Sequence, residues 1–228
     1  MRPKDSNGDW LTPFDPYALA HADSSIGGHY TEGNALQYTW HVMQDIEGLI
    51  ELLGGKEEAG ELLDYFFNTT QESDVQLADV TGLIGQYAHG NEPSHHIAYI
   101  YSYLDRPAET QRLIRQITTD FYKNKPDGLI GNDDCGQMSA WYMFSSMGFY
   151  PMNPVSGEFV IGAPQIEGAK INVGNGKHFT MEAKNLSEKN MYIDKVELNG
   201  NPLTEKFITY KEIMAGGTLV FHMTDTPK

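Results

Sequence analysis

The feature that most constrains the fold of this chain is a change of residue pattern near residue 151. Before Pro151, apolar residues recur at three- and four-residue steps, which is typical of amphipathic helices. After it, short segments alternate apolar and polar residues between Gly- and Asn-containing turns, which is typical of strands. We therefore expect an α+β chain with a helical domain at residues 1–152 and a β domain at residues 153–228.

The helical part shows start and stop signals at most of its expected helix ends. Ser94 is a candidate N-cap, Pro107 suits the first turn of a helix, and Gly54 and Gly148 suit helix ends. Short loops between neighbouring helices predict at least two antiparallel helical hairpins. The expected helices cover residues 36–53, 57–67, 94–104, 107–121 and 137–147.

The β part has turn signals at a spacing that is typical of a sandwich. It carries few clusters of reactive side chains, so its default role is packing and support. The expected strands cover residues 158–161, 170–173, 178–183, 192–198 and 218–222.

Charge and cysteine content exclude several classes of function. The chain has 16 basic and 31 acidic residues and a net charge of -15, which disfavours nucleic acid and anionic membranes as partners. This acidity is compatible with calcium and with neutral, hydroxyl-rich ligands. A single cysteine, Cys135, excludes an intrachain disulfide and a zinc site built on several thiolates.

Hydrophobic residues make up 40% of the chain without a long apolar run, so we expect a globular protein without a membrane span. No charged and then apolar leader follows Met1, so we expect no signal peptide in this chain. The polar opening, residues 1–5, is typical of a loop inside a larger protein.

Three polar clusters lie in glycine-bearing loops that lead into expected helices, at residues 30–34, 90–96 and 132–134. Helical hairpins bring alternate loops to one end of an assembly, so Glu32, Glu92 and Asp134 can converge there. Carboxylates beside aromatic rings are typical of a glycosidase cleft, in which one acid protonates the leaving oxygen and another activates water. The candidate stacking rings are Trp10, Tyr30, Trp40, Tyr87 and Trp141.

Each acidic residue of the three loops also has a simpler interpretation. Asp134 can cap the helix that follows it while Asp133 faces water. Glu92 can be an ion-pair or helix-entry residue, and Glu32 can lie on the surface of its loop. The catalytic interpretation of the aspartate pair instead expects it close to low-dielectric packing, where two acids cannot both ionise cheaply.

The adjacent histidines His95 and His96 leave a further choice open. They can ligate a metal, but oxygen ligands outnumber imidazoles here, so calcium suits this stretch better than a transition metal. Adjacent histidines at a helix start more often pack or donate hydrogen bonds.

Three motifs together resemble glycoside hydrolase family 92, whose members are calcium-dependent, inverting exo-α-mannosidases. They are YTEGNALQYTW at residues 30–40, GQYAHGNEPSHH at 85–96 and GNDDCGQMSAWY at 131–142. The resemblance implies that residues 1–152 are the later helices of a partial (α/α)6 barrel and that a small antiparallel β-sandwich-like region follows them. It also implies an N-terminal domain of the same full-length enzyme as a partner, a periplasmic or secreted location, and terminal α-1,2-linked mannose of N-glycans as substrate.

The resemblance implies a role for particular residues. Glu32 becomes the general acid and Asp134 the general base. Asn132 stands where some members carry a carboxylate, and its side chain can form a hydrogen bond with the attacking water. Asp133, between Asn132 and Asp134, is a further candidate catalytic residue. Leu36 departs from the Trp that is common at its position in the family.

The same resemblance implies contacts to the sugar and to calcium. The family's ion binds the 2- and 3-hydroxyls of mannose, and the candidate calcium ligands are Glu92, Asn91 and Gln37. The candidate substrate contacts are Trp10, Trp40 and His95.

Overall fold

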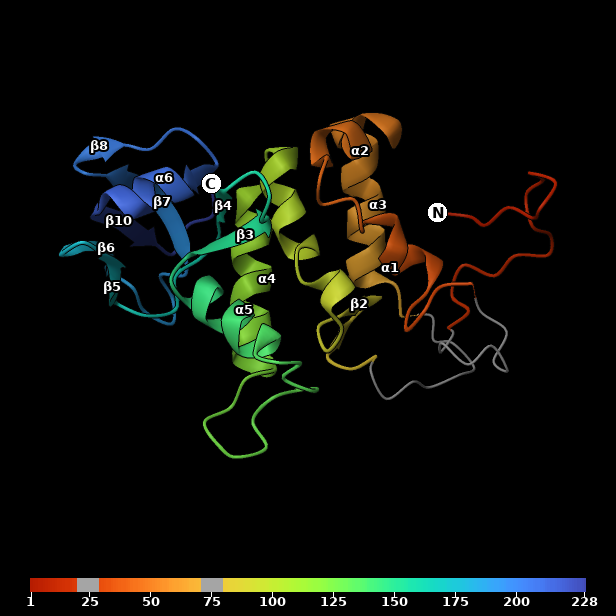
Figure 1. Cartoon of the computed structure of the whole chain (residues 1–228), viewed down its shortest axis with the longest axis horizontal. Helices are drawn as coiled ribbons and strands as arrows, with labels where there is room; N and C mark the ends of the chain where they lie inside the picture. The colour runs from red at the N-terminus through yellow and green to blue at the C-terminus, as the bar shows by residue number, and fades with distance from the viewer. Residues whose placement is uncertain (20–28, 71–79) are drawn as a thin grey trace. The chain divides into compact units, whose positions relative to one another are not determined.

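The computed structural model describes residues 1–19, 29–70 and 80–228, and the chain divides into two compact units. Unit 1 comprises Met1–Ile97 and Leu129–Asp133, and unit 2 comprises Ala98–Gly128 and Asp134–Lys228; Figure 1 shows the elements of each. These units are a different division from the domains predicted at residues 1–152 and 153–228, which stay a prediction.

The single helix predicted over residues 36–53 is wrong. Unit 1 has two short helices there, α1 (Ala35–Thr39) and α2 (Ile46–Leu52). The carboxylate of Asp45 accepts a hydrogen bond of 3.0 Å from the Gly48 amide and so caps the N-terminus of α2. The apolar spacing continues across the break because both helices bury one face, so periodicity alone does not reveal it.

The second predicted helix is confirmed as α3 (Lys56–Asn68). It is followed by a hairpin of two short antiparallel strands, β1 (Leu83–Ile84) and β2 (Tyr87–Ala88). Gly85 in the hairpin turn has φ +59°, and a Cβ there would lie 2.5 Å from the carbonyl oxygen of Phe66. Glycine is therefore required for the hairpin to pack against the end of α3.

We expect Gly85→Ala to lower the free energy of unfolding by about 3 kcal/mol, because a left-handed backbone strain adds to an overlap with backbone atoms. Gly8→Ala is the control, since Gly8 has φ +89° but no atom within 4 Å of an added Cβ. The control is expected to cost only about 1 kcal/mol in denaturant unfolding. Equal losses in the two variants would contradict a packing role for Gly85.

The helix predicted from Ser94 to residue 104 is not an α-helix. The chain forms the 3-10 helices η1 (Glu92–Ser94) and η2 (Ile97–Leu104), and Ser94 Oγ accepts from the Ala88 amide at 3.4 Å instead of capping. Most of η2 is buried, with Tyr99 at 0% exposed, so tertiary packing decides its geometry.

Unit 2 contains the two remaining predicted helices, α4 (Pro107–Asp120) and α5 (Gln137–Ser146). Pro107 occupies the first turn of α4, and Gly148, with φ +89°, follows the end of α5, as predicted. Helix α5 is apolar nearly all round in sequence but is only partly buried, because Trp141 is 0% exposed and Met143 is 62% exposed.

The five predicted strands all form, and residues 158–161 and 192–198 match their strands end to end. One sheet has the order β3 (Phe149–Asn153), β4 (Glu158–Ile161) and β9 (Phe207–Thr209). The other has the order β5 (Gly168–Gly174), β6 (Lys177–Lys184), β10 (Gly217–Thr224), β7 (Tyr192–Leu198) and β8 (Asn201–Pro202).

The expectation of a purely antiparallel β region needs one correction. Strands β6 and β10 pair in parallel, whereas the other strand pairs of these two sheets, among the described residues, are antiparallel. The short helix α6 (Tyr210–Ala215) lies between β9 and β10 in the chain and begins with a capping box of Thr209 and Glu212. The chain between β6 and β10 passes through β7, β8, β9 and α6, so this parallel pair is joined by a long connection rather than a tight turn.

Both sheets contribute to one apolar core, which makes the β region sandwich-like. Phe149 and Ile208 come from the three-stranded sheet, and Phe179, Leu219 and Phe221 from the other, and all are 0% exposed. Helix α4 joins this region through Gln111, whose Oε1 accepts 2.9 Å from the Ile193 amide. The α+β class is therefore observed, while membership of the helices in an (α/α)6 barrel stays a prediction.

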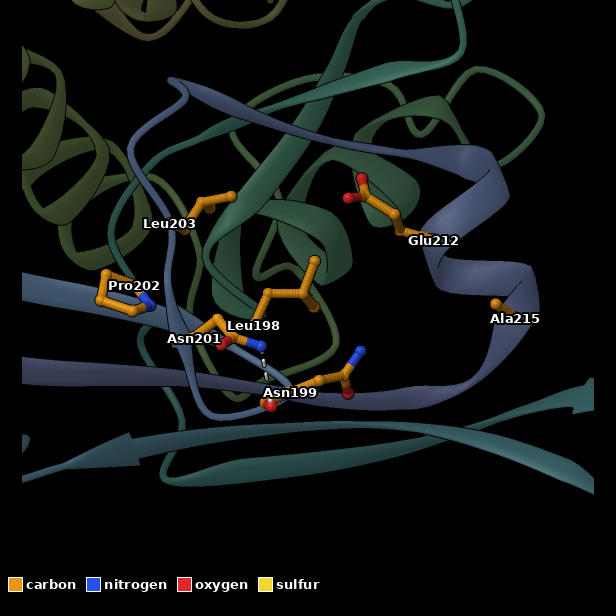
Figure 2. A pocket seen from close by; sticks show the side chains of 7 residues that line it. All are labelled: Leu198, Asn199, Asn201, Pro202, Leu203, Glu212 and Ala215. Carbon is orange, nitrogen blue, oxygen red and sulfur yellow. Dashed lines mark hydrogen bonds between the residues drawn. The ribbon is translucent and has the colours of Figure 1, made fainter.

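A pocket of about 360 Å³ lies where the β7–β8 turn faces α6 in unit 2. Figure 2 shows the side chain of Glu212 approaching it from α6, with Asn199 on the turn and Asn201 at the start of β8. The residues around this pocket include none of the predicted site residues; they are Leu198, Asn199, Asn201, Pro202, Leu203, Glu212 and Ala215. Among the helices of the described residues, none combines the length and apolar character that crossing a bilayer demands.

Candidate active site

The first two predicted loops meet in unit 1. Glu32 sits in the turn just before α1, and the Nδ2 group of Asn91, just before η1, donates a 2.6 Å hydrogen bond to its backbone carbonyl. Asn91 is only 7% exposed, so this bond is shielded from water. The structure therefore brings Glu32 next to the loop that carries Glu92.

The third predicted loop enters the same unit with residues 129–133. Gly131 passes so close to this loop that a Cβ on it would lie 3.2 Å from the Cα of Gly90. The segment with Asn132 and Asp133 therefore runs beside the residue that precedes Asn91. Asp134 follows Asp133 directly in the chain and opens the second segment of unit 2.

The environment predicted for the aspartate pair is wrong in this chain. Asp133 and Asp134 are exposed, as is Asn132, rather than close to low-dielectric packing. The capping alternative for Asp134 is also not observed, because Gly136 is the N-cap of α5 and no side chain among the described residues caps that helix. The Asp134 carboxyl group is therefore not committed to the helix.

Backbone conformations at the predicted acid and base are unusual for residues with side chains. Glu32 has φ 52° and Asp134 has φ 45°, both in the left-handed region. Each such residue costs about 1–2 kcal/mol, and strain of this kind collects at functional sites. The two predicted catalytic residues therefore share a feature that the residue pattern does not show.

Two tyrosines accompany the Glu32 turn. The Tyr30 and Tyr38 rings lie with centroids 5.1 Å apart, and the Tyr38 hydroxyl donates to the Thr31 carbonyl at 2.7 Å. Burial, and to a smaller extent the Glu32 carboxylate, raises the pKa of the Tyr38 phenol. The Glu32 carboxylate is therefore close enough to this ring to act on it electrostatically.

A buried amide network follows Glu32 and was not predicted. Asn34 and Gln37 form a reciprocal capping box at the start of α1, and Asn34 Nδ2 donates 2.8 Å to Gln86 Oε1. Gln37 Nε2 donates 3.0 Å to the backbone carbonyl of Gln86. The signal that could have found it is the spacing of Asn34 and Gln37, which fits a capping box with Asn as the cap.

The candidate calcium ligands differ in how well they fit. Gln37 fits poorly, because both ends of its side-chain amide bond within the buried network. Asn91 and the half-buried Glu92 are oxygen donors of the kind that calcium prefers, and they are neighbours before and at the start of η1. Among the residues described here, no group of three or more His, Cys, Asp or Glu side chains could hold a metal ion. Glu92 and Asn91 stay candidate ligands, and calcium stays a prediction.

The side chains of His95 and His96 form hydrogen bonds with backbone carbonyl groups. His95 Nε2 donates 2.9 Å to the His89 carbonyl, and His96 Nε2 donates 2.6 Å to the Trp40 carbonyl. His89 Nδ1 lies 2.7 Å from the Tyr87 hydroxyl. These contacts favour the hydrogen-bonding interpretation of the pair over metal ligation, and a sugar contact by His95 stays a prediction.

Burial lowers the pKa of two of these imidazoles, those of His89 and His96. It lowers the pKa of His89 well below its ordinary value, with His95 adding to the effect, and lowers the pKa of His96 to about 4. The unfolded chain therefore binds a proton near pH 6.5 that folded His96 takes up only near pH 4. We expect the unfolding free energy to fall by roughly 3 kcal/mol from this residue as pH drops across that interval.

Denaturant unfolding of the wild type and of His96→Gln between pH 7 and pH 4 tests this expectation. Gln can still donate to the Trp40 carbonyl but does not titrate, so the variant should lose less stability on acidification. Parallel curves for the two proteins would contradict the assignment.

The two predicted tryptophans lie in opposite environments. Trp40 is 2% exposed, with its ring centroid 6.3 Å from that of Phe66, so it has the position of a core residue. Trp10 is 57% exposed and has the Lys4 ammonium 4.5 Å from its ring centroid. Of the two, only Trp10 has a ring that a sugar could reach in this chain, and both contacts stay predictions.

Sequence comparison decides the family. The profile of the glycosyl hydrolase family 92 catalytic domain matches residues 1–225. The chain belongs to glycosyl hydrolase family 92. The resemblance seen in the three motifs is thereby confirmed over residues 1–225 of this chain.

Solved structures of family 92 enzymes share this fold. An α-mannosidase of the family from Bacteroides thetaiotaomicron, solved with mannoimidazole, is 45% identical, with a TM-score of 0.92 over 100% of this chain and 30% of its own. An inverting mannosidase of the family from the same organism is 36% identical, with a TM-score of 0.83 over 100% of this chain and 31% of its own.

A curated relative from Arthroderma benhamiae is described as an uncharacterized secreted glycosidase. It is 30% identical over 191 residues, which cover 82% of this chain and 23% of the relative. The chain thus spans about a quarter to a third of the length of the relatives it matches.

Proposed function

We propose that this chain supplies the general acid and general base of a larger enzyme that hydrolyses terminal α-linked mannose in glycans. The observation that carries the proposal lies in unit 1, where Asn91 binds the Glu32 backbone and the first residues of the third motif pass beside Gly90; Asp134 is the next residue of that motif. The mannosidase activity named for the two Bacteroides relatives supports mannose as the sugar.

In the proposed reaction, the Glu32 carboxylic acid gives its proton to the glycosidic oxygen as the bond to the anomeric carbon breaks. Asp134 takes a proton from the water that attacks the opposite face of the sugar, and Asn132 orients that water. Inversion requires about 6.5–9.5 Å between the two carboxyl groups, which leaves room for the water. Asp133, the neighbouring acid, would add a second negative charge beside Asp134.

Calcium, held by Glu92 with Asn91 as a weaker candidate, would bind the 2- and 3-hydroxyls of mannose and favour a distorted ring. The remaining walls of the site would come from an N-terminal domain of the same full-length enzyme. We place that enzyme in the periplasm or outside the cell, in agreement with the relative described as secreted.

Chelation tests the role of the ion. Treating the full-length enzyme with a calcium chelator is expected to abolish mannose release, because the ion that would hold the sugar by its 2- and 3-hydroxyls is removed. Added Ca²⁺ should restore the rate, while Mg²⁺ should not, since it demands a smaller octahedral site. An enzyme that keeps its rate in chelator, with circular dichroism unchanged, would remove calcium from the mechanism.

Linkage and stereochemistry need separate measurements. Rates on α-1,2-, α-1,3- and α-1,6-linked mannobiose are expected to favour the α-1,2 linkage. Proton NMR of the first product should show β-mannose from an α-linked substrate, and initial release of α-mannose would contradict inversion.

A second possibility is a carbohydrate-binding or structural piece without turnover of its own. Mannose release and calcium-dependent sugar binding by this chain alone separate the two. We expect little activity from the isolated chain, because a site built partly by another domain is incomplete. If the full-length protein also fails to release mannose, the second possibility replaces the first.

A further inference from the structure

Asn91 makes a contact that a calcium ligand does not require. Its side chain donates through nitrogen to the Glu32 backbone carbonyl at 2.6 Å, across 59 positions of sequence. A metal ligand would act through the amide oxygen, which is the opposite end of the same group. The observed bond therefore points to a function in holding the Glu32 turn.

The Glu32 turn needs such support. Glu32 has φ 52°, a conformation that a residue with a side chain adopts only when its surroundings impose it. On one side of the turn Asn91 fixes the Glu32 carbonyl, and on the other Asn34 is tied to Gln86 by a 2.8 Å bond. Asn91, Asn34 and Gln86 are each no more than 9% exposed, so water competes little for these bonds.

We propose that Asn91 is a positioning residue that sets the backbone conformation of Glu32 and thereby the direction in which its carboxyl group delivers a proton. This inference rests on the proposed function of Glu32 as general acid. A shift of the acid by about 1 Å can lower a rate by about 100-fold, because proton delivery depends on alignment with the glycosidic oxygen.

The variant Asn91→Asp separates positioning from metal binding. It keeps the size of the side chain and a calcium-compatible oxygen but replaces the N–H donor with a second oxygen that repels the Glu32 carbonyl. In the full-length enzyme we expect kcat on an unactivated α-mannobiose to fall by about 100-fold. On an aryl α-mannoside with an activated leaving group, which needs little protonation, the fall should be under about 5-fold.

Two further measurements distinguish a misplaced general acid from a general loss of structure in Asn91→Asp. Calcium affinity, measured by titration calorimetry with Ca²⁺ alone, should be unchanged or tighter in Asn91→Asp. The alkaline limb of the pH profile of kcat/KM, which reports the general acid, should shift. A purely structural defect would lower the rates on both substrates by the same factor.

Asn68→Asp is a matched control in the same unit. Asn68 Nδ2 also donates to a backbone carbonyl, that of Asp64 at 2.7 Å, but it lies exposed at the end of α3. Its rates on both substrates should stay within about 2-fold of the wild type, as is usual for exposed positions. If Asn91→Asp does not fold, Asn91→Ser, which is neutral and too short for this contact, serves in its place.

The results also tell failure of the inference from failure of the proposed function. If Glu32→Gln shows a leaving-group-dependent loss but Asn91→Asp lowers both rates equally or weakens calcium binding, Asn91 is not a positioning residue. If Glu32→Gln itself shows no such dependence, the role of Glu32 as general acid fails first.

Discussion

Replacing Glu32 by Gln in the full-length enzyme is expected to lower kcat on unactivated α-mannosides by about 10²–10⁴-fold, the range typical of a lost general acid. The amide has nearly the same shape as the carboxylic acid but cannot give up a proton at neutral pH. The fall in kcat should be smaller on an aryl mannoside with an activated leaving group, because that group departs without protonation. Initial rates on the two substrates measure the effect.

Glu61→Gln is the control for the loss of one negative charge in unit 1, since Glu61 lies exposed on α3. It should keep its rate within about 2-fold on either substrate. A Glu32→Gln enzyme as active as this control would show that Glu32 is not the acid and that its unusual φ angle serves another purpose.

The second large effect is expected for Asp134→Asn. The amide cannot take a proton from the attacking water, so kcat should fall by about 10²–10⁴-fold. In contrast to the Glu32 variant, the fall should be the same on activated and unactivated substrates, because both reactions need the water. The different dependence on the leaving group identifies which carboxyl group is the acid and which is the base.

Asp127→Asn is the matched control, because Asp127 is an exposed acid in the same part of the chain and pairs with Lys125 at 3.3 Å. An exposed pair of this kind contributes little to stability, so both folding and rate should be close to those of the wild type. Selective recovery of Asp134→Asn on activated substrates would reverse the proposed roles of the two residues.

Local pattern predicted the elements whose boundaries are set by local chemistry. Pro107 and Gly148 mark the start of α4 and the end of α5 because proline fixes φ and glycine accepts a positive φ. The strands at residues 158–161 and 192–198 were predicted because their side chains alternate between two environments.

Pattern failed where a distant contact or a side-chain cap decided. The break between α1 and α2 depends on a cap by Asp45, and the parallel pairing of β6 with β10 depends on which strands meet in space. Neither leaves a trace in hydrophobic periodicity, since the apolar residues continue to face a core in either arrangement.

By itself, the sequence determined the family and the chemical types present at the site, because three motifs with their carboxylates, amides and glycines are specific enough to identify a family 92 chain. The tertiary structure decided which side chains form hydrogen bonds with each other and which are buried. It showed that Gln37 and Asn34 lie in a buried amide network, that Asn91 holds Glu32 by its backbone, and that Trp40 packs in the core. These contacts join residues up to 59 positions apart, and no local rule of residue spacing can specify a hydrogen bond that forms only when distant segments fold together.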